Sequence, residues 1–287
     1  MPLRRPSLIK FLLTILCLAA IASPLAPPSR SLAEEGDFLE TFQGYLNPAP
    51  LGLDARYAWT LPGGRGENVR VCDIEYSWNL THSDLSNAAA NLFIYVKGVY
   101  PLPDQAINEA SWNHGTAVIG EMVAADDGVG ITGIANRAQL GLINPLTGGS
   151  TPDVAAAIRR ASDAMEAGDV ILLEQQSVQG PQFDPTTGRG LVPIEFEPDV
   201  FNAIKAATNK GIIVVESAGH GSENLDRASY DGKFDRTKRD SGALMVGAGL
   251  PEGGIYGPGP DRTRTAESNY GSIVDVHGWG RFITTTG

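Results

Sequence analysis

The strongest constraint on the fold is an alternation of short apolar runs and helical segments after residue 66. We predict strands at residues 69–73, 139–144, 170–174, 212–216, 243–248 and 272–276. We predict helices at residues 113–125, 151–167 and 198–210. Nearly continuous apolar character in so short a strand is typical of burial on both faces of a parallel sheet. The pattern therefore predicts a single three-layer α/β domain with helices on both faces of a central parallel sheet.

Chemical groups are expected beyond the carboxyl ends of these strands, because ligands of open parallel sheets gather there. Asp73 ends the first strand, and a carboxylate at this place can orient a histidine or bind a cation. His114 lies farther along in Asn113-His114-Gly115-Thr116, where we expect it to open a helix. The sequence thus predicts an imidazole and a carboxylate at the same edge of the sheet.

The amino terminus has the pattern of a secretory signal peptide. Basic Arg4, Arg5 and Lys10 precede an apolar run at residues 11–22, and small residues follow as far as Ala33. The run is shorter than the roughly 20 residues that a membrane-spanning helix needs. We therefore expect cleavage near Ala33 and a secreted or periplasmic protein, with no membrane contact after signal removal. We divide the chain into signal peptide 1–33, amino-terminal extension 34–66 and folded domain 67–287.

Charge and histidine spacing narrow the classes of partner and cofactor. The formal net charge is −11, and all four basic residues of the signal precede the first acid, so the rest is more acidic still. Such a chain repels nucleic acids and anionic lipid surfaces, and we expect neither as a partner. The four histidines lack the spacing of a zinc site, so we assign no metal. No cofactor is expected to be required, although Asp126-Asp127 leaves structural calcium open.

One motif favours a different function by its letters alone. Residues 128–133 satisfy G-x-G-x-x-G, the phosphate-binding fingerprint of dinucleotide enzymes. That fingerprint needs a strand before it and a helix after it, whereas here a predicted helix precedes and a strand follows. We therefore reject a dinucleotide site.

Several segments, in order, resemble the subtilisin-like serine peptidases. The Asp73 strand is followed by His82-Ser-Asp84-Leu85, similar to the family's His-Pro-Asp-Leu, and by His114-Gly-Thr. The remaining matches are Gly128-Val-Gly-Ile-Thr-Gly-Ile-Ala135, Ser268-Asn-Tyr-Gly271 and Val274-Asp275-Val276. The resemblance covers roughly residues 66–287.

The resemblance implies roles for particular residues. Asp73 would hold the imidazole of His114, and His114 would act as general base and then general acid in acyl transfer. The segment Glu174-Gln175-Gln176 stands where the family has an extended Ser-Leu-Gly strand that pairs with the peptide substrate. A peptide or protein substrate and a monomeric state follow as expectations.

Two positions depart from the family. Its oxyanion asparagine is matched by His220, whose side chain could still donate a hydrogen bond but with different geometry and protonation; losing one such donor costs about 10²–10³ in turnover. The nucleophile belongs to a Gly-Thr-Ser-x-Ala segment, and no Gly-Thr-Ser occurs in the 287 residues.

We therefore expect a subtilisin-like fold that lacks its carboxyl-terminal part, from a secreted serine endopeptidase whose nucleophile is absent from this chain. As it stands, the chain is expected to have no peptidase activity. The alternative is a catalytically inactive exported binding protein, or a relic, with the same fold.

Overall fold

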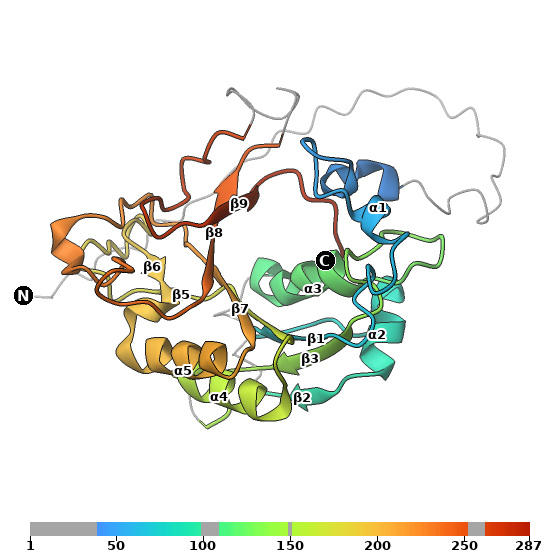
Figure 1. The fold of residues 1–287 in the computed structure, drawn as a ribbon, viewed down its shortest axis with the longest axis horizontal. Helices are drawn as coiled ribbons and strands as arrows, with labels where there is room; N and C mark the ends of the chain where they lie inside the picture. The colour runs from blue at the N-terminus through green and yellow to red at the C-terminus, as the bar shows by residue number, and fades with distance from the viewer. Residues whose placement is uncertain (1–38, 99–108, 149–150, 252–261) are drawn as a thin grey trace, which may run out of the picture.

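A seven-stranded parallel sheet forms the centre of the computed structural model, which describes residues 39–98, 109–148, 151–251 and 262–287 (Figure 1). Its strands are β1 Arg70–Ile74, β2 Ile94–Val96, β3 Gln139–Ile143, β4 Val170–Leu173, β7 Ile213–Ser217, β8 Leu244–Gly249 and β9 Val276–Trp279. Their spatial order is β2-β3-β1-β4-β7-β8-β9. A small antiparallel pair, β5 Gln176–Ser177 and β6 Val192–Pro193, follows β4. The predicted parallel α/β fold is confirmed.

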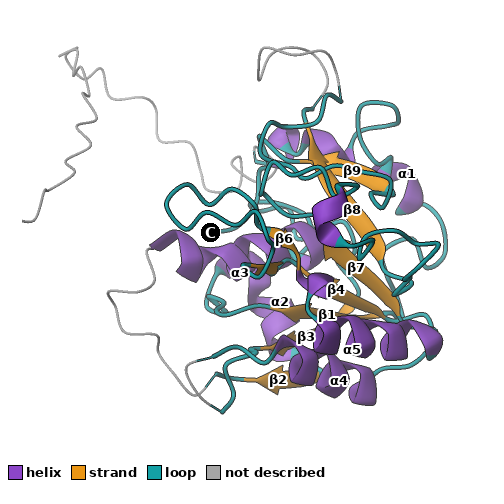
Figure 2. Cartoon of the chain, turned by 90° about the vertical axis from the view of Figure 1, so that its left-hand side faces the viewer, coloured by secondary structure: helices purple, strands orange, loops and turns teal. Residues whose placement is uncertain are grey.

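Helices cover both faces of the sheet (Figure 2). The α-helices are α1 Ala55–Ala58, α2 Ser86–Ala90, α3 Glu109–Val123, α4 Val154–Ala164 and α5 Pro198–Asn209. The 3-10 helices are η2 Glu40–Phe42, η3 Gly44–Leu46, η4 Ser83–Leu85, η5 Ile194–Phe196 and η6 Ala228–Tyr230.

The face under α4 and α5 holds the largest core (Figure 1). Ile158 of α4 and Ile204 of α5 are fully buried, together with Ile171 of β4. Asp153 begins α4 as its N-cap, because its carboxylate accepts a hydrogen bond of 2.8 Å from the Ala156 N–H. This packing holds the central strands rigid, so the loops at their carboxyl ends have a fixed base.

The opposite face is covered unevenly. Ile119 of α3 packs with Leu140 and Leu142 of β3, and all three are buried. Farther along the sheet, Ile213 of β7 is 49% exposed and Val276 of β9 is 47% exposed. Helices therefore leave part of this face between α3 and β9 uncovered.

Residues near the amino terminus pack against the carboxyl-terminal segment. Tyr45 lies edge-on to Trp279, and its hydroxyl donates a hydrogen bond of 2.8 Å to the Thr284 carbonyl. The Thr286 hydroxyl donates one of 2.6 Å to the Thr116 carbonyl of α3. These contacts place the last residues against the helix that carries His114 (Figure 1).

Element boundaries differ from the sequence prediction in several places, and α4 is three residues shorter at each end than the predicted 151–167. Helix α3 starts at Glu109, so His114 lies in its second turn and does not open it. The last strand lies at β9, later than the predicted residues 272–276, because Gly271 has a φ of +148° and the 271–274 segment turns. The short strand β2 was not predicted.

The predicted signal peptide, residues 1–33, lies outside the described residues. In the part of the chain that is described, no helix has both the length and the apolar character needed to cross a membrane.

Candidate active site

His114 is held by a carboxylate that follows β1. Its Nδ1 atom lies 2.8 Å from Oε2 of Glu75, and the Glu75 side chain is buried. The next residue in α3 is Gly115, where a Cβ atom would lie 2.4 Å from the Ser77 carbonyl oxygen. Glycine therefore allows α3 to approach the 75–77 backbone closely enough for this hydrogen bond.

Asp73 does not make the contact proposed for it from the sequence. Its Oδ2 atom accepts a hydrogen bond of 2.7 Å from the Trp78 indole N–H, and the side chain is 1% exposed. Burial raises the pKa of Asp73 well above its ordinary value, although the Trp78 hydrogen bond opposes this. The structure thus corrects the assignment: alternate strand residues share a face, and Glu75, two residues farther along, reaches the imidazole.

A second carboxylate faces the other ring nitrogen. Oε2 of Glu174, directly after β4, lies 3.5 Å from Nε2 of His114. The hydrogen bond with Glu75 raises the pKa of His114 to about 9, against the opposing effect of desolvation. Burial also raises the pKa of Glu174, while the charge of His114 lowers it. Both carboxylates therefore stabilise the cationic form of the imidazole.

A cavity of about 500 Å³ opens beside this histidine, between the carboxyl ends of β4 and β7 and the strands β8 and β9. Its walls include His114, Glu174, Gln176, Ser217 and His220. This brings four predicted site residues together: His114, Glu174, Gln176 and His220. The remaining two, Asp73 and Gln175, are buried and do not line the cavity.

The turn after β7 is fixed from two sides. The His220 backbone N–H donates a hydrogen bond of 2.5 Å to Oε1 of Gln176, and the His220 side chain is exposed. Asn269 is fully buried, and its amide donates hydrogen bonds to the carbonyls of Leu191 and Ala218. Asn269, which the sequence analysis noted only as part of a motif, is therefore a positioning residue for this turn.

Glu75 and Glu121 are the charged residues of this site that the sequence analysis missed. Burial raises the pKa of Glu121, two turns after His114 in α3, to about 7. Glu75 could have been recognised because it immediately follows a strand end, on the same strand face as Asp73.

No metal site emerges from the described residues, among which no group of three or more histidine, cysteine, aspartate or glutamate side chains is arranged to hold an ion. Asp126 forms an ion pair of 2.6 Å with Arg65. Structural calcium therefore stays an untested prediction.

The glycine-rich segment at 128–133 wraps around a carboxylate. Oδ2 of Asp84 accepts a hydrogen bond of 3.0 Å from the Ile131 N–H, and a Cβ at Gly130 would lie 2.2 Å from the same oxygen. Gly130 also has a φ of +75°. These contacts explain the glycine there structurally, without a nucleotide.

Comparison with known proteins gives a consistent family. A model described as the subtilase family matches residues 66–257. A thermophilic serine proteinase from a Bacillus species is 29% identical over 85% of this chain and 51% of its own length. Subtilisin DY from Bacillus licheniformis is 27% identical over 71% of this chain and 72% of its own length.

A solved structure supports the fold. A protease from Pseudoalteromonas arctica aligns with a TM-score of 0.55 and 20% identity, covering 86% of this chain and 72% of that chain. The chain therefore spans about half the length of the first curated relative and roughly three quarters of the second.

Proposed function

This chain belongs to the subtilase family, and from that premise we propose that it is part of a serine endopeptidase whose catalytic carboxylate and imidazole are Glu75 and His114. The hydrogen bond of 2.8 Å between Glu75 and His114 carries the proposal. A carboxylate on Nδ1 fixes the tautomer of a catalytic imidazole and stabilises the imidazolium that forms during acyl transfer. In its neutral form, with the proton on Nδ1 bonded to Glu75, His114 takes the proton of a nucleophile at Nε2 and later delivers it to the leaving amine.

The nucleophile is proposed to be a serine outside these 287 residues. The carboxyl-terminal segment supports this position, since a Cβ at Gly287 would lie 3.5 Å from Asn113 O and from Cβ of Ala117, on either side of His114. Ser272, one of the serines near glycines, is already engaged, because its hydroxyl donates a hydrogen bond of 2.7 Å to Asp226.

The substrate is proposed to be an extended peptide in the cavity between residues 174–176 and 217–220. His220 stands at the oxyanion position, where its exposed imidazole is available as a donor. Its backbone N–H is occupied by Gln176, which would have to release it to serve the oxyanion. We further propose that the protein is exported after cleavage near Ala33 and acts as a monomer without a required cofactor.

A second function, an exported binding protein with the same cleft, is favoured by one observation. The carboxylate of Glu174 lies beside Nε2, the nitrogen that a nucleophile has to reach. In a binding protein that contact would be permanent, whereas in a peptidase the nucleophile would displace it.

The test reads the coding DNA beyond codon 287 and assays the encoded proteins on unfolded casein. We expect an in-frame Gly-Thr-Ser-x-Ala motif, no hydrolysis by the 287-residue protein, and hydrolysis by the extended protein that His114→Ala abolishes. A stop codon without such a motif would contradict the peptidase and support the binding protein. Hydrolysis by the 287-residue protein that is lost in His114→Ala would show that the nucleophile is within it.

A further inference from the structure

Two carboxylates beside this cavity share one cationic partner, His114. Glu174 has an ion pair with His114 at 3.5 Å, but the shorter contact of that imidazole is with Glu75 at 2.8 Å. One imidazolium therefore serves two carboxylates. In the described part of the chain, no arginine or lysine forms an ion pair with either of them.

The described wall of the cavity supplies no lysine or arginine to these carboxylates. Beside His114 and Glu174 it is lined by polar Gln176, Ser217 and His220 and by apolar residues such as Leu172 and Val215. A buried or partly buried carboxylate needs a cation or several donors to compensate its charge. The wall therefore leaves Glu174 with the distant side of one imidazole as its cationic partner.

Glu174 is placed to meet a side chain that enters the cavity. It follows β4 at the start of the 174–176 segment, and its carboxylate is 32% exposed. Gln176, two residues on, closes the far side through its hydrogen bond to the His220 N–H. A side chain lodged between these two walls would therefore have the Glu174 carboxylate within reach.

Resting on the proposed function, we propose that Glu174 is the specificity-determining residue of this cleft and selects peptides with a cationic arginine or lysine side chain. An ammonium or guanidinium group would bring positive charge and N–H donors to the Glu174 carboxylate. Guanidinium is the better fit, because its planar fork of N–H groups can donate two hydrogen bonds to the Glu174 carboxylate.

The experiment measures peptide binding by isothermal titration calorimetry on the full 287-residue protein, so it requires no catalysis. The probes are acetyl-Ala-Ala-Pro-Arg-amide and the same peptide with citrulline, which is isosteric and neutral. We expect the arginine peptide to bind at least about tenfold more tightly. We also expect this preference to shrink in 1 M NaCl, since the partly exposed ion pair is screened.

The matched variants are Glu174→Gln and Glu166→Gln. Glu166 lies at the opposite end of β4 with an 81% exposed side chain. We expect Glu174→Gln to abolish the preference for arginine and Glu166→Gln to retain it. Equal binding of the two peptides by the unmodified protein would overturn the specificity proposal and leave the peptidase proposal standing, and this comparison needs no variant to fold. Failure of both peptides to bind would contradict both proposals.

Discussion

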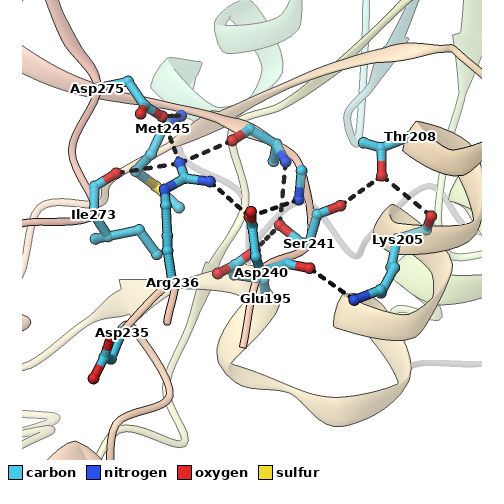
Figure 3. A network of polar contacts seen from close by, with 12 residues as sticks. Glu195, Lys205, Thr208, Asp235, Arg236, Asp240, Ser241, Met245, Ile273 and Asp275 are labelled. Carbon is cyan, nitrogen blue, oxygen red and sulfur yellow. Dashed lines mark hydrogen bonds and ion pairs between the residues drawn. The ribbon is translucent and has the colours of Figure 1, made fainter. Parts of the chain in front are cut away.

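Arg236 pairs with two carboxylates that also accept backbone hydrogen bonds, whereas around His114 several carboxylates share one imidazole. Arg236 forms ion pairs of 2.8 Å with Asp240 and 2.6 Å with Asp275 (Figure 3). Asp240 also accepts a hydrogen bond from the Gly242 N–H, and Asp275 accepts one from the Met245 N–H. We call Arg236, Asp240 and Asp275 the Arg236 network. It joins the 235–243 loop to β8 and to the segment before β9.

The contrasting set, which we call the His114 cluster, consists of His114 with Asp73, Glu75, Glu121 and Glu174. Burial raises the pKa of Asp73, Glu121 and Glu174, because their charged forms lack sufficient compensation. Asp240, in the Arg236 network, has a lowered pKa, chiefly through its hydrogen bond with Gly242. Compensated carboxylates stabilise a fold, whereas an uncompensated cluster in a cleft is the electrostatic signature of a functional site.

The largest expected effect comes from removing the cation of the Arg236 network. Arg236→Met leaves two carboxylates without their cation and the Ala243 carbonyl without its 3.0 Å donor. We expect the free energy of unfolding to fall by about 2–4 kcal/mol, measured by urea denaturation. Arg159→Met, at an exposed position of α4, should change it by less than about 0.5 kcal/mol. Equal losses in the two variants would remove the structural distinction of the Arg236 network.

The second prediction separates the two acids nearest to β1. Glu75→Gln should lower the pKa of His114 from about 9 toward its ordinary 6.5, because the Glu75 hydrogen bond is the main cause of the raised value. Asp73→Asn should change the His114 pKa much less, since Asp73 is bonded to Trp78. NMR titration of the His114 ring protons measures both, with a His114→Gln spectrum for assignment. A larger effect of Asp73→Asn would restore the original assignment of Asp73.

The third prediction concerns the pH dependence of stability. The raised pKa of His114 means that the folded state binds its proton more tightly than the unfolded state does. The resulting stabilisation is fully present below pH 6.5 and is lost as the pH rises through about 9. After discounting for solvent screening we expect a loss of about 1 kcal/mol across this window, read from thermal unfolding at each pH. His114→Gln should flatten the profile there, and an unchanged profile would contradict the coupling.

The smallest expected effect is a gain from removing an uncompensated acid. Glu121 has a pKa of about 7, so the folded state binds its proton more tightly than the unfolded state does. The stability gained from that proton is complete below about pH 4.5 and is lost as the pH rises through 7. Glu121→Gln should therefore increase stability at pH 8 by up to about 1 kcal/mol and leave it unchanged at pH 4. Glu67→Gln is the opposite control, because backbone hydrogen bonds lower the Glu67 pKa and its charge stabilises the fold at pH 8. A loss in both variants at pH 8 would show that Glu121 is compensated after all.

The sequence predicted the central strands because their apolar runs are nearly uninterrupted, and the structure places β1, β3, β4, β7 and β8 within a residue or two of those runs. It missed β2, whose three residues are too few to show a period. It also placed β9 too early, since the apolar letters of 272–276 are shared between a turn and a strand. Short elements depend on their neighbours more than on their own residues.

For the candidate site, local sequence was sufficient to identify His114, the 174–176 segment and the turn at His220, because each directly follows or faces a predicted strand end. It could not choose between Asp73 and Glu75, which share a strand face two residues apart. That choice depends on how closely α3 approaches the 75–77 backbone and on the Trp78 indole that binds Asp73. Pattern and spacing act along the chain and determine the sheet and its chemical edge. Which carboxylate meets the imidazole is decided by side-chain packing between segments, and only the tertiary structure shows it.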